Sequence, residues 1–210
     1  MRLSSLAAVV LAMLPSVAGA HEIWIERDAA GPARIYLGEP GEAPPPGGDP
    51  EFAKLQKPRL LGTATAPLVR RAGFLEAAVP AGDVRLWDDT VFAPWGPTEK
   101  REGVVYYARA GREQPVAALP FELVPVAPNA SRFILTRDRK PVANTAVTLF
   151  APDRAKTELR TDAAGMVAAP TARPGRYLLV AAARDDGPAT LPGGPVHVVH
   201  HITTTSFVAP

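Results

Sequence analysis

The sequence of 210 residues contains no cysteine. This absence excludes disulfide scaffolds, thiolate-ligated zinc sites and cysteine nucleophiles. The sequence also lacks an excess of charge of one sign, because it has 23 lysines and arginines and 21 aspartates and glutamates. A nucleic-acid-binding protein, by contrast, needs a clustered basic face. Beyond residue 20 no apolar run approaches the ~20 residues of a membrane-spanning helix. We therefore expect no nucleic-acid partner and no membrane span in the chain after residue 20.

Signals for long helices are scarce as well. The chain contains 24 prolines and 17 glycines, which disfavour long helices and favour short strands joined by turns. We predict an all-β fold of two β-sandwich-like units, with a loop over Asp185–Pro195. Residues 1–20 form a signal peptide, residues 21–126 an N-terminal β-rich domain and residues 131–210 a C-terminal β-sandwich. The segment 103–109 fits a strand or a helix equally well.

The first twenty residues have the pattern of an export signal. Met1-Arg2 is a short cationic start, and the apolar run Leu3–Leu14 is too short to cross a membrane. Ala18-Gly19-Ala20 then places small residues at the two positions that a signal peptidase inspects. We predict cleavage after Ala20 and a periplasmic location.

Cleavage at this point would make His21 the first residue of the mature chain. An N-terminal histidine carries an α-amine with a pKa of roughly 7.7–8.0 and an imidazole with a pKa of about 6.5. Both groups are therefore available as neutral nitrogen donors near neutral pH, and together they can chelate one divalent transition-metal ion. Imidazole nitrogen suits zinc, copper, iron and nickel.

The other three histidines, His197, His200 and His201, lie within five residues of one another, and none occurs between them and His21. The surrounding β-branched segment 196–208 predicts a strand, on which His197 and His201 share one face and His200 points to the other. His197 and His201 would be roughly 13 Å apart on a straight strand, which is too far for one ion with metal–nitrogen bonds of about 2.0–2.1 Å. We predict a metal site in which one or two of these three residues join His21; which of them do so stays open. Such a nitrogen-rich donor set suits copper(II) or nickel(II).

Other groups fit a structural role better than a chemical one. No glycine-flanked serine nucleophile and no phosphate-cradling glycine loop occurs, so we assign no catalytic residue. Glu22 and Glu26 share the first strand with His21 and would supply oxygen ligands or orient an imidazole, although a solvated strand face explains them more simply. Three further functional roles are possible: a cation site at Asp88–Asp89, a phenol near a metal from Tyr106–Tyr107, and a sugar-binding platform of Trp24, Trp87 and Trp95. For each group we favour a structural role instead.

Three turn motifs in the second half of the chain resemble a known module. The segments Lys140–Leu149, Thr161–Gly165 and Arg173–Leu179 contain a lysine-proline turn, a threonine-aspartate-x-x-glycine turn and a proline-glycine turn. Their spacing resembles the carboxypeptidase-regulatory-like, or prealbumin-like, β-sandwich of the immunoglobulin-like class. This module occurs in many unrelated proteins, so the resemblance implies a fold and no activity.

The chain as a whole also resembles one secreted bacterial family. The signal peptide, the opening His21–Glu26 and the segment Leu119–Pro125 before the sandwich are similar to a domain-of-unknown-function family described as the periplasmic component of nickel or cobalt uptake (NikM/NikK-type). The resemblance implies a periplasmic accessory protein that binds nickel or cobalt and supports a membrane metal transporter. The alternatives are a copper-binding protein or a histidine-brace copper oxidase or monooxygenase, and a scaffold that binds no metal.

Overall fold

The computed structural model describes residues 21–62 and 67–210, so the predicted signal peptide lies outside the described residues. In the described part, the helical elements are two short 3-10 turns, η1 (Pro50–Lys54) and η2 (Thr98–Lys100), and strands dominate. The predicted all-β, sandwich-like fold class is therefore confirmed. None of the described helical segments has the length and apolar character needed to cross a membrane.

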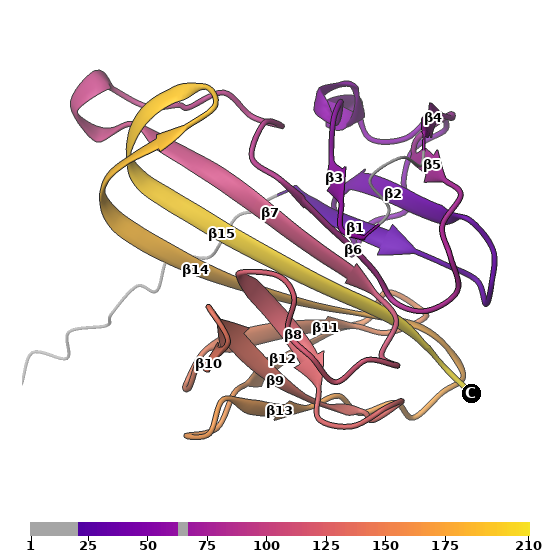
Figure 1. The fold of residues 1–210 in the computed structure, drawn as a ribbon. Helices are drawn as coiled ribbons and strands as arrows, with labels where there is room; N and C mark the ends of the chain where they lie inside the picture. Colours follow the sequence, from indigo (N-terminus) through magenta and orange to yellow (C-terminus); the bar gives the residue numbers. More distant parts are fainter. Residues whose placement is uncertain (1–20, 63–66) are drawn as a thin grey trace, which may run out of the picture.

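A seven-stranded sheet forms the centre of the molecule (Figure 1). Strand β15 pairs antiparallel with β14 on one side and parallel with β7 on the other. The sheet therefore joins strands from both sides of the proposed boundary at residues 126–131. In spatial order its strands are β12 (Lys156–Arg160), β11 (Ala146–Phe150), β14 (Gly175–Leu191), β15 (Gly194–Ala209), β7 (Glu102–Ala110), β6 (Val84–Asp88) and β3 (Arg59–Leu60).

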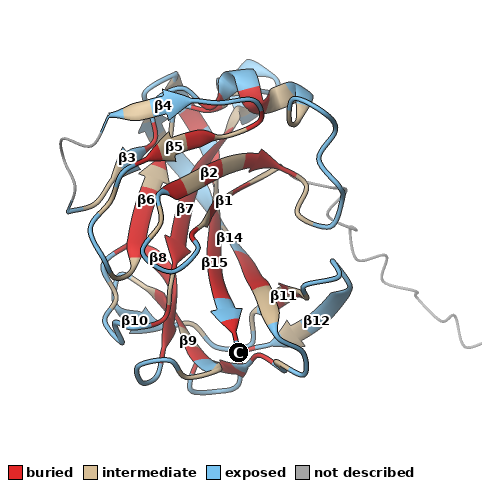
Figure 2. Ribbon diagram, turned by 90° about the vertical axis from the view of Figure 1, so that its right-hand side faces the viewer, coloured by how far each residue is buried: buried red, intermediate tan, exposed pale blue. Residues whose placement is uncertain are grey.

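Two smaller sheets cover the two faces of this central sheet, and buried residues line both interfaces (Figure 2). The first covering sheet has the order β1 (Glu22–Glu26), β2 (Ala33–Gly38), β5 (Leu75–Ala77) and β4 (Leu68–Arg70). The second has the order β10 (Lys140–Pro141), β9 (Arg132–Arg137) and β13 (Met166–Ala168), with β8 (Phe121–Pro125) also paired to β9. The result is three layers of sheet enclosing two hydrophobic cores.

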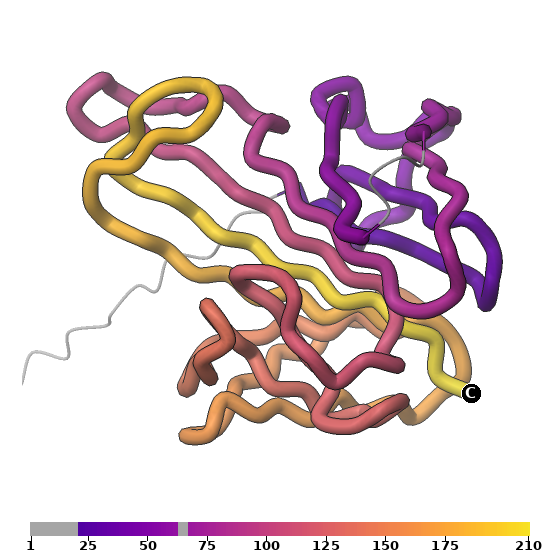
Figure 3. Tube along the Cα trace, in the orientation of Figure 1, coloured from indigo at the N-terminus to yellow at the C-terminus, as the bar shows by residue number. Residues whose placement is uncertain are grey.

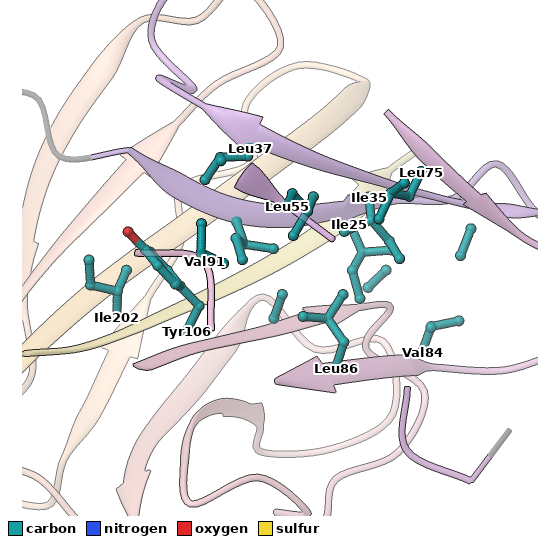
Figure 4. Packing of buried hydrophobic residues seen from close by; sticks show 14 of the residues in the cluster. Ile25, Ile35, Leu37, Leu55, Leu75, Val84, Leu86, Val91, Tyr106 and Ile202 are labelled. Atoms are coloured by element: carbon teal, nitrogen blue, oxygen red, sulfur yellow. The ribbon is translucent and has the colours of Figure 1, made fainter. Parts of the chain in front are cut away.

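The position of strand β7 between two cores explains why the sequence of the segment 103–109 fits a strand or a helix equally well. Its side chains alternate, so that Val104 and Tyr106 enter the first core while Val105 and Tyr107 enter the second. Figure 4 shows Tyr106 packed among the first-core residues. A strand that is buried on both faces has a nearly continuous apolar sequence, which removes the alternation that identifies a half-buried strand.

Strand β15 ties the central sheet to both covering sheets through small hydroxyl side chains. Thr204 Oγ1 donates a hydrogen bond to the carbonyl oxygen of Ile23 (2.7 Å), and Ser206 Oγ donates to that of Ile25. On the other face, Thr205 Oγ1 donates to the carbonyl oxygen of Leu123 in β8 (3.1 Å). These three residues are fully buried. Their hydroxyls satisfy strand carbonyls that would otherwise be unpaired away from water.

The segment predicted as a loop at Asp185–Pro195 is instead the continuation of a long hairpin, so that prediction was wrong (Figure 3). Strand β14 runs to Leu191 because residues 185–191 continue to pair antiparallel with β15. The register shifts between Asp186 and Ala189, a bulge that accommodates the glycine and proline between them.

Candidate functional site

His21 and His200 line one cavity of about 650 Å³, whose other lining residues come from β7, β14, β15 and the segment 92–95. The hydrogen bonds from Thr204 to Ile23 and from Ser206 to Ile25 hold β1 alongside β15 in the neighbouring layer. His21 directly precedes β1, so it lies above the part of β15 that precedes Thr204. The cavity is lined by His21, Phe92, Trp95, Glu102, Val104, Tyr106, Ala182, Ala183, Arg184, His200 and Ile202.

The imidazole of His21 is oriented by a carboxylate. Its Nε2 lies 3.1 Å from Oδ1 of Asp49, which also accepts the backbone N–H of Glu51 (2.7 Å) and so caps η1. Because a carboxylate accepts hydrogen bonds, Nε2 is the donor, and in the neutral form of the imidazole Nδ1 then has the lone pair. The ring of Phe92 stands edge-on to the imidazole, with 6.3 Å between centroids. His21 therefore has one ring nitrogen held and the other available.

His200 has a similar arrangement in the same cavity. Its Nε2 lies 2.5 Å from Oε2 of Glu102, and the indole of Trp95 stacks on its ring with centroids 5.8 Å apart. Trp95 and Glu102 are joined by two backbone hydrogen bonds of 2.9 Å, which places both side chains beside His200. Glu102 again holds Nε2 as the donor, so Nδ1 of His200 keeps its lone pair.

Two further groups set the electrostatics nearby. Tyr106 lines the cavity, and burial together with the carboxylates of Glu22 and Asp88 raises the pKa of its phenol well above the usual range, so the phenol stays protonated. Burial and the neighbouring Glu39 raise the pKa of Glu22 to about 8, although Lys156 acts against this shift. The side chain of Glu22 lines an adjoining groove of about 810 Å³ and not this cavity.

The structure separates the other two predicted ligands from this cavity. His201 lies on the opposite face of β15, where Nδ1 is 3.2 Å from the hydroxyl of Tyr107 and Nε2 is 3.2 Å from Oδ2 of Asp185. Both ring nitrogens of His201 therefore have partners. Burial, followed by the positive charge of Arg137, lowers its pKa. His197 is exposed near the hairpin end of β15.

The four histidines thus do not gather at one point. Within residues 21–62 and 67–210, no three His, Asp or Glu side chains converge as a metal-binding group. The structure brings one late histidine, His200, to the same cavity as His21. Strand β1 does not pair with β15: it pairs with β2 and lies alongside β15 in the neighbouring layer.

The remaining candidates have structural roles in the described chain. Oδ1 of Asp88 accepts hydrogen bonds from the N–H and the hydroxyl of Thr90 (2.7 and 2.6 Å), which forms the polar turn expected there. Glu26 accepts the indole N–H of Trp24 (3.2 Å) and pairs with Arg176. The three tryptophans lie apart: Trp24 stacks on Tyr36, Trp87 packs beside the second core, and Trp95 stacks on His200.

Sequence reasoning missed Asp49, Glu102 and the aromatic walls of the cavity. Asp49 precedes Pro50 and Glu51, a helix-start pattern that predicts a cap, but nothing in it indicates contact with His21. Glu102 is 98 residues from His200 and reaches it only because β7 and β15 are parallel neighbours. Pairing between strands so distant in sequence leaves no local signal.

Comparison with protein-family models, with curated proteins and with solved structures finds no match for this chain.

Proposed function

We propose that this protein binds one divalent transition-metal ion in the cavity lined by His21 and His200 and acts as a periplasmic accessory in nickel or cobalt uptake. The observation that carries the proposal is the matched pair of imidazoles. His21 and His200 line one cavity from two layers of the fold, and a carboxylate holds Nε2 of each. A metal-binding histidine commonly donates its other ring N–H to a carboxylate in this way, which fixes the ring and strengthens the free nitrogen as a donor.

His21 would supply two of the donors. After the predicted cleavage behind Ala20, its α-amine is free, and the chelate joins this amine to the ring nitrogen nearer the backbone, Nδ1. The contact between Nε2 and Asp49 leaves Nδ1 with its lone pair. The proposal therefore depends on processing, because any residue that precedes His21 converts the amine into an amide, which is a poor donor.

His200 would supply the third nitrogen from across the cavity. Its side chain is 32% exposed and that of His21 27%, so solvent reaches both imidazoles. The carboxylates of Asp49 and Glu102 lie directly behind the two rings and offset the two positive charges of the ion. A set of nitrogen donors suits nickel(II) and copper(II).

The role in uptake rests on the resemblance of the sequence to periplasmic components of nickel and cobalt transport systems. A protein with this role would deliver its ion to a membrane metal transporter. The metal is then cargo, and a site that solvent reaches is consistent with release.

A copper protein with oxidase or monooxygenase activity is the second candidate. The phenol of Tyr106 in the same cavity as two imidazoles favours it, because a phenol that stays protonated can donate a hydrogen bond to a reacting group. Oxygen uptake by the copper-loaded protein in the presence of a reductant would support the copper enzyme. Metal binding without oxygen uptake would support the accessory.

Calorimetry on the correctly processed protein tests the proposal directly. The protein that begins at His21 is titrated with nickel(II), cobalt(II), copper(II) and zinc(II), beside a version with one additional residue before His21. We expect one-to-one binding by the first protein and loss of that binding by the second. Equal, weak binding by both versions would contradict the proposal. The preferred ion separates nickel or cobalt uptake from copper chemistry.

A further inference from the structure

The cavity is much larger than a metal ion needs. An ion with six water molecules would fill roughly 180 Å³, if each water takes its share of about 30 Å³ in the liquid. The cavity measures about 650 Å³. Volumes of about 300–1,000 Å³ with mainly apolar walls and a few placed polar groups are typical of sites for small organic molecules.

The walls between the two imidazoles are apolar and aromatic. Val104, Ile202 and Phe92 line the cavity together with Trp95. The indole of Trp95 covers His200 with one face, yet 42% of this residue is exposed, so a large part of the indole is free for another contact. A bare or hydrated ion has no use for such walls, because apolar surface gives it nothing in exchange for its water.

Cations stand beside this apolar surface. Arg184, the neighbour of His200 across the β14–β15 ladder, lines the cavity and pairs with the exposed Asp186 at 2.9 Å. The ammonium of Lys54 lies 4.8 Å from the centre of the Phe92 ring and pairs with Glu51. Exposed ion pairs of this kind are weak, so Arg184 can exchange its partner for a carboxylate on a ligand in the cavity.

We infer that the cavity takes the metal as a complex with a small organic acid that chelates it, the ion bound by His21 and His200 and the organic part against Trp95 and Phe92. This inference rests on the proposed metal-binding function. Three protein nitrogens leave three positions open on a six-coordinate ion, and a tridentate carboxylate chelator would fill them. Such a complex carries less positive charge than the bare ion, which suits the position of Arg184 at the cavity.

Competition between the protein and a chelator for nickel distinguishes binding of a metal–chelator complex from binding of the metal ion alone. The processed protein loaded with nickel(II) is titrated with citrate, iminodiacetate or free histidine. Native mass spectrometry detects any complex of protein, metal and chelator, and equilibrium dialysis measures chelator retained with and without metal. We expect at least one chelator to be retained only in the presence of nickel, in a one-to-one-to-one complex. If all three strip the metal without forming such a complex, the inference is wrong and metal binding itself stands.

Trp95→Ala separates the organic part of the site from the metal part. The amount of chelator retained per bound nickel ion should fall by about tenfold, the upper range for loss of one aromatic contact. Trp24→Ala, which removes an indole outside the cavity, is the matched control and should retain the chelator normally. Unchanged retention in Trp95→Ala would overturn the inference. Failure of the processed protein to bind nickel with or without a chelator would overturn the proposed function as well.

Discussion

His200 and His201 are neighbours on β15 with different surroundings. His200 faces the first covering sheet, keeps one ring nitrogen without a protein partner, and has a side chain that is 32% exposed in an open aromatic cavity. His201 faces the second covering sheet, is 14% exposed, and has both ring nitrogens engaged by Tyr107 and Asp185. The alternation of a strand places the two in different layers. Residue type and closeness in sequence therefore do not by themselves indicate a shared site.

The same contrast continues along the strand toward its end. Thr204 and Ser206 donate to carbonyls of β1, whereas Thr205 donates to a carbonyl of β8. Thr203, on the His201 face, is fully buried and its hydroxyl has no hydrogen-bond partner. One face of β15 thus holds the strand that carries His21, and the other holds the second core.

The largest expected effect separates the two histidines. His200→Ala should weaken nickel binding by more than the roughly 10- to 100-fold that loss of an outer-shell partner costs, because a direct donor is removed. His201→Ala is the matched control and should leave the affinity unchanged, since its ring nitrogens are already engaged on the other face. Calorimetric titration of both variants checks this, and equal losses in the two would contradict the assignment of the site to one face.

A smaller loss is expected when the carboxylates behind the rings are neutralised. Asp49→Asn and Glu102→Gln keep the size of the side chain but remove its charge. They weaken the hydrogen bond that fixes the imidazole tautomer and remove the negative charge that offsets the charge of the ion. Metal affinity should fall by roughly 10- to 100-fold in each variant. Asp185→Asn, which changes the carboxylate beside His201, serves as the control. Unchanged affinity in both test variants would show that these carboxylates do not support a metal site.

Substitutions of two threonines of β15 test the contrast between its two faces through the free energy of unfolding. Thr204→Val leaves the carbonyl of Ile23 without its buried donor and should cost about 1–3 kcal/mol in the free energy of unfolding. Thr203→Val replaces a buried hydroxyl that has no partner with a methyl group of similar shape, so it should be neutral or stabilising by about 1 kcal/mol. Denaturation in urea measures both values. Equal destabilisation would mean that the hydroxyl of Thr204 has no special role in holding β1.

The smallest effect concerns pH. Burial raises the pKa of Asp88, and Asp89 adds to the shift, while hydrogen bonds from Thr90 and the charge of Arg59 act against it. A raised folded-state pKa stabilises the protein fully below the unfolded-state pKa of about 3.9, and this contribution is lost as pH rises through the folded-state value.

Asp88→Asn should therefore gain stability relative to the wild type at pH 7, by about 1 kcal/mol or less, because the buried charge is removed and the turn acceptor is kept. The difference should shrink as the pH falls and the native carboxyl takes up a proton. Thermal unfolding of both proteins at several pH values measures it. A difference that is constant with pH would mean that Asp88 does not titrate in this way.

Much of the local structure could be predicted from the sequence. The glycine and proline content predicted short strands, the alternation of Ile23 and Ile25 predicted the first of them, and the β-branched run after His197 predicted the last. The opposite orientation of His200 and His201 also followed from strand geometry alone. These features depend on neighbouring residues, which the sequence displays directly.

Only the tertiary structure decided what surrounds each histidine. Asp49 is 28 residues from His21, and Glu102 is 98 residues from His200. Which covering sheet lies over which face of β15 depends on strand pairing across the whole chain and on side chains such as Thr204 that join the layers. The sequence therefore determined the positions of the histidines and the strand face on which His200 and His201 each lie. The packing of three layers determined that His21 and His200 share a cavity, because pairing between distant strands has no local signature in the sequence.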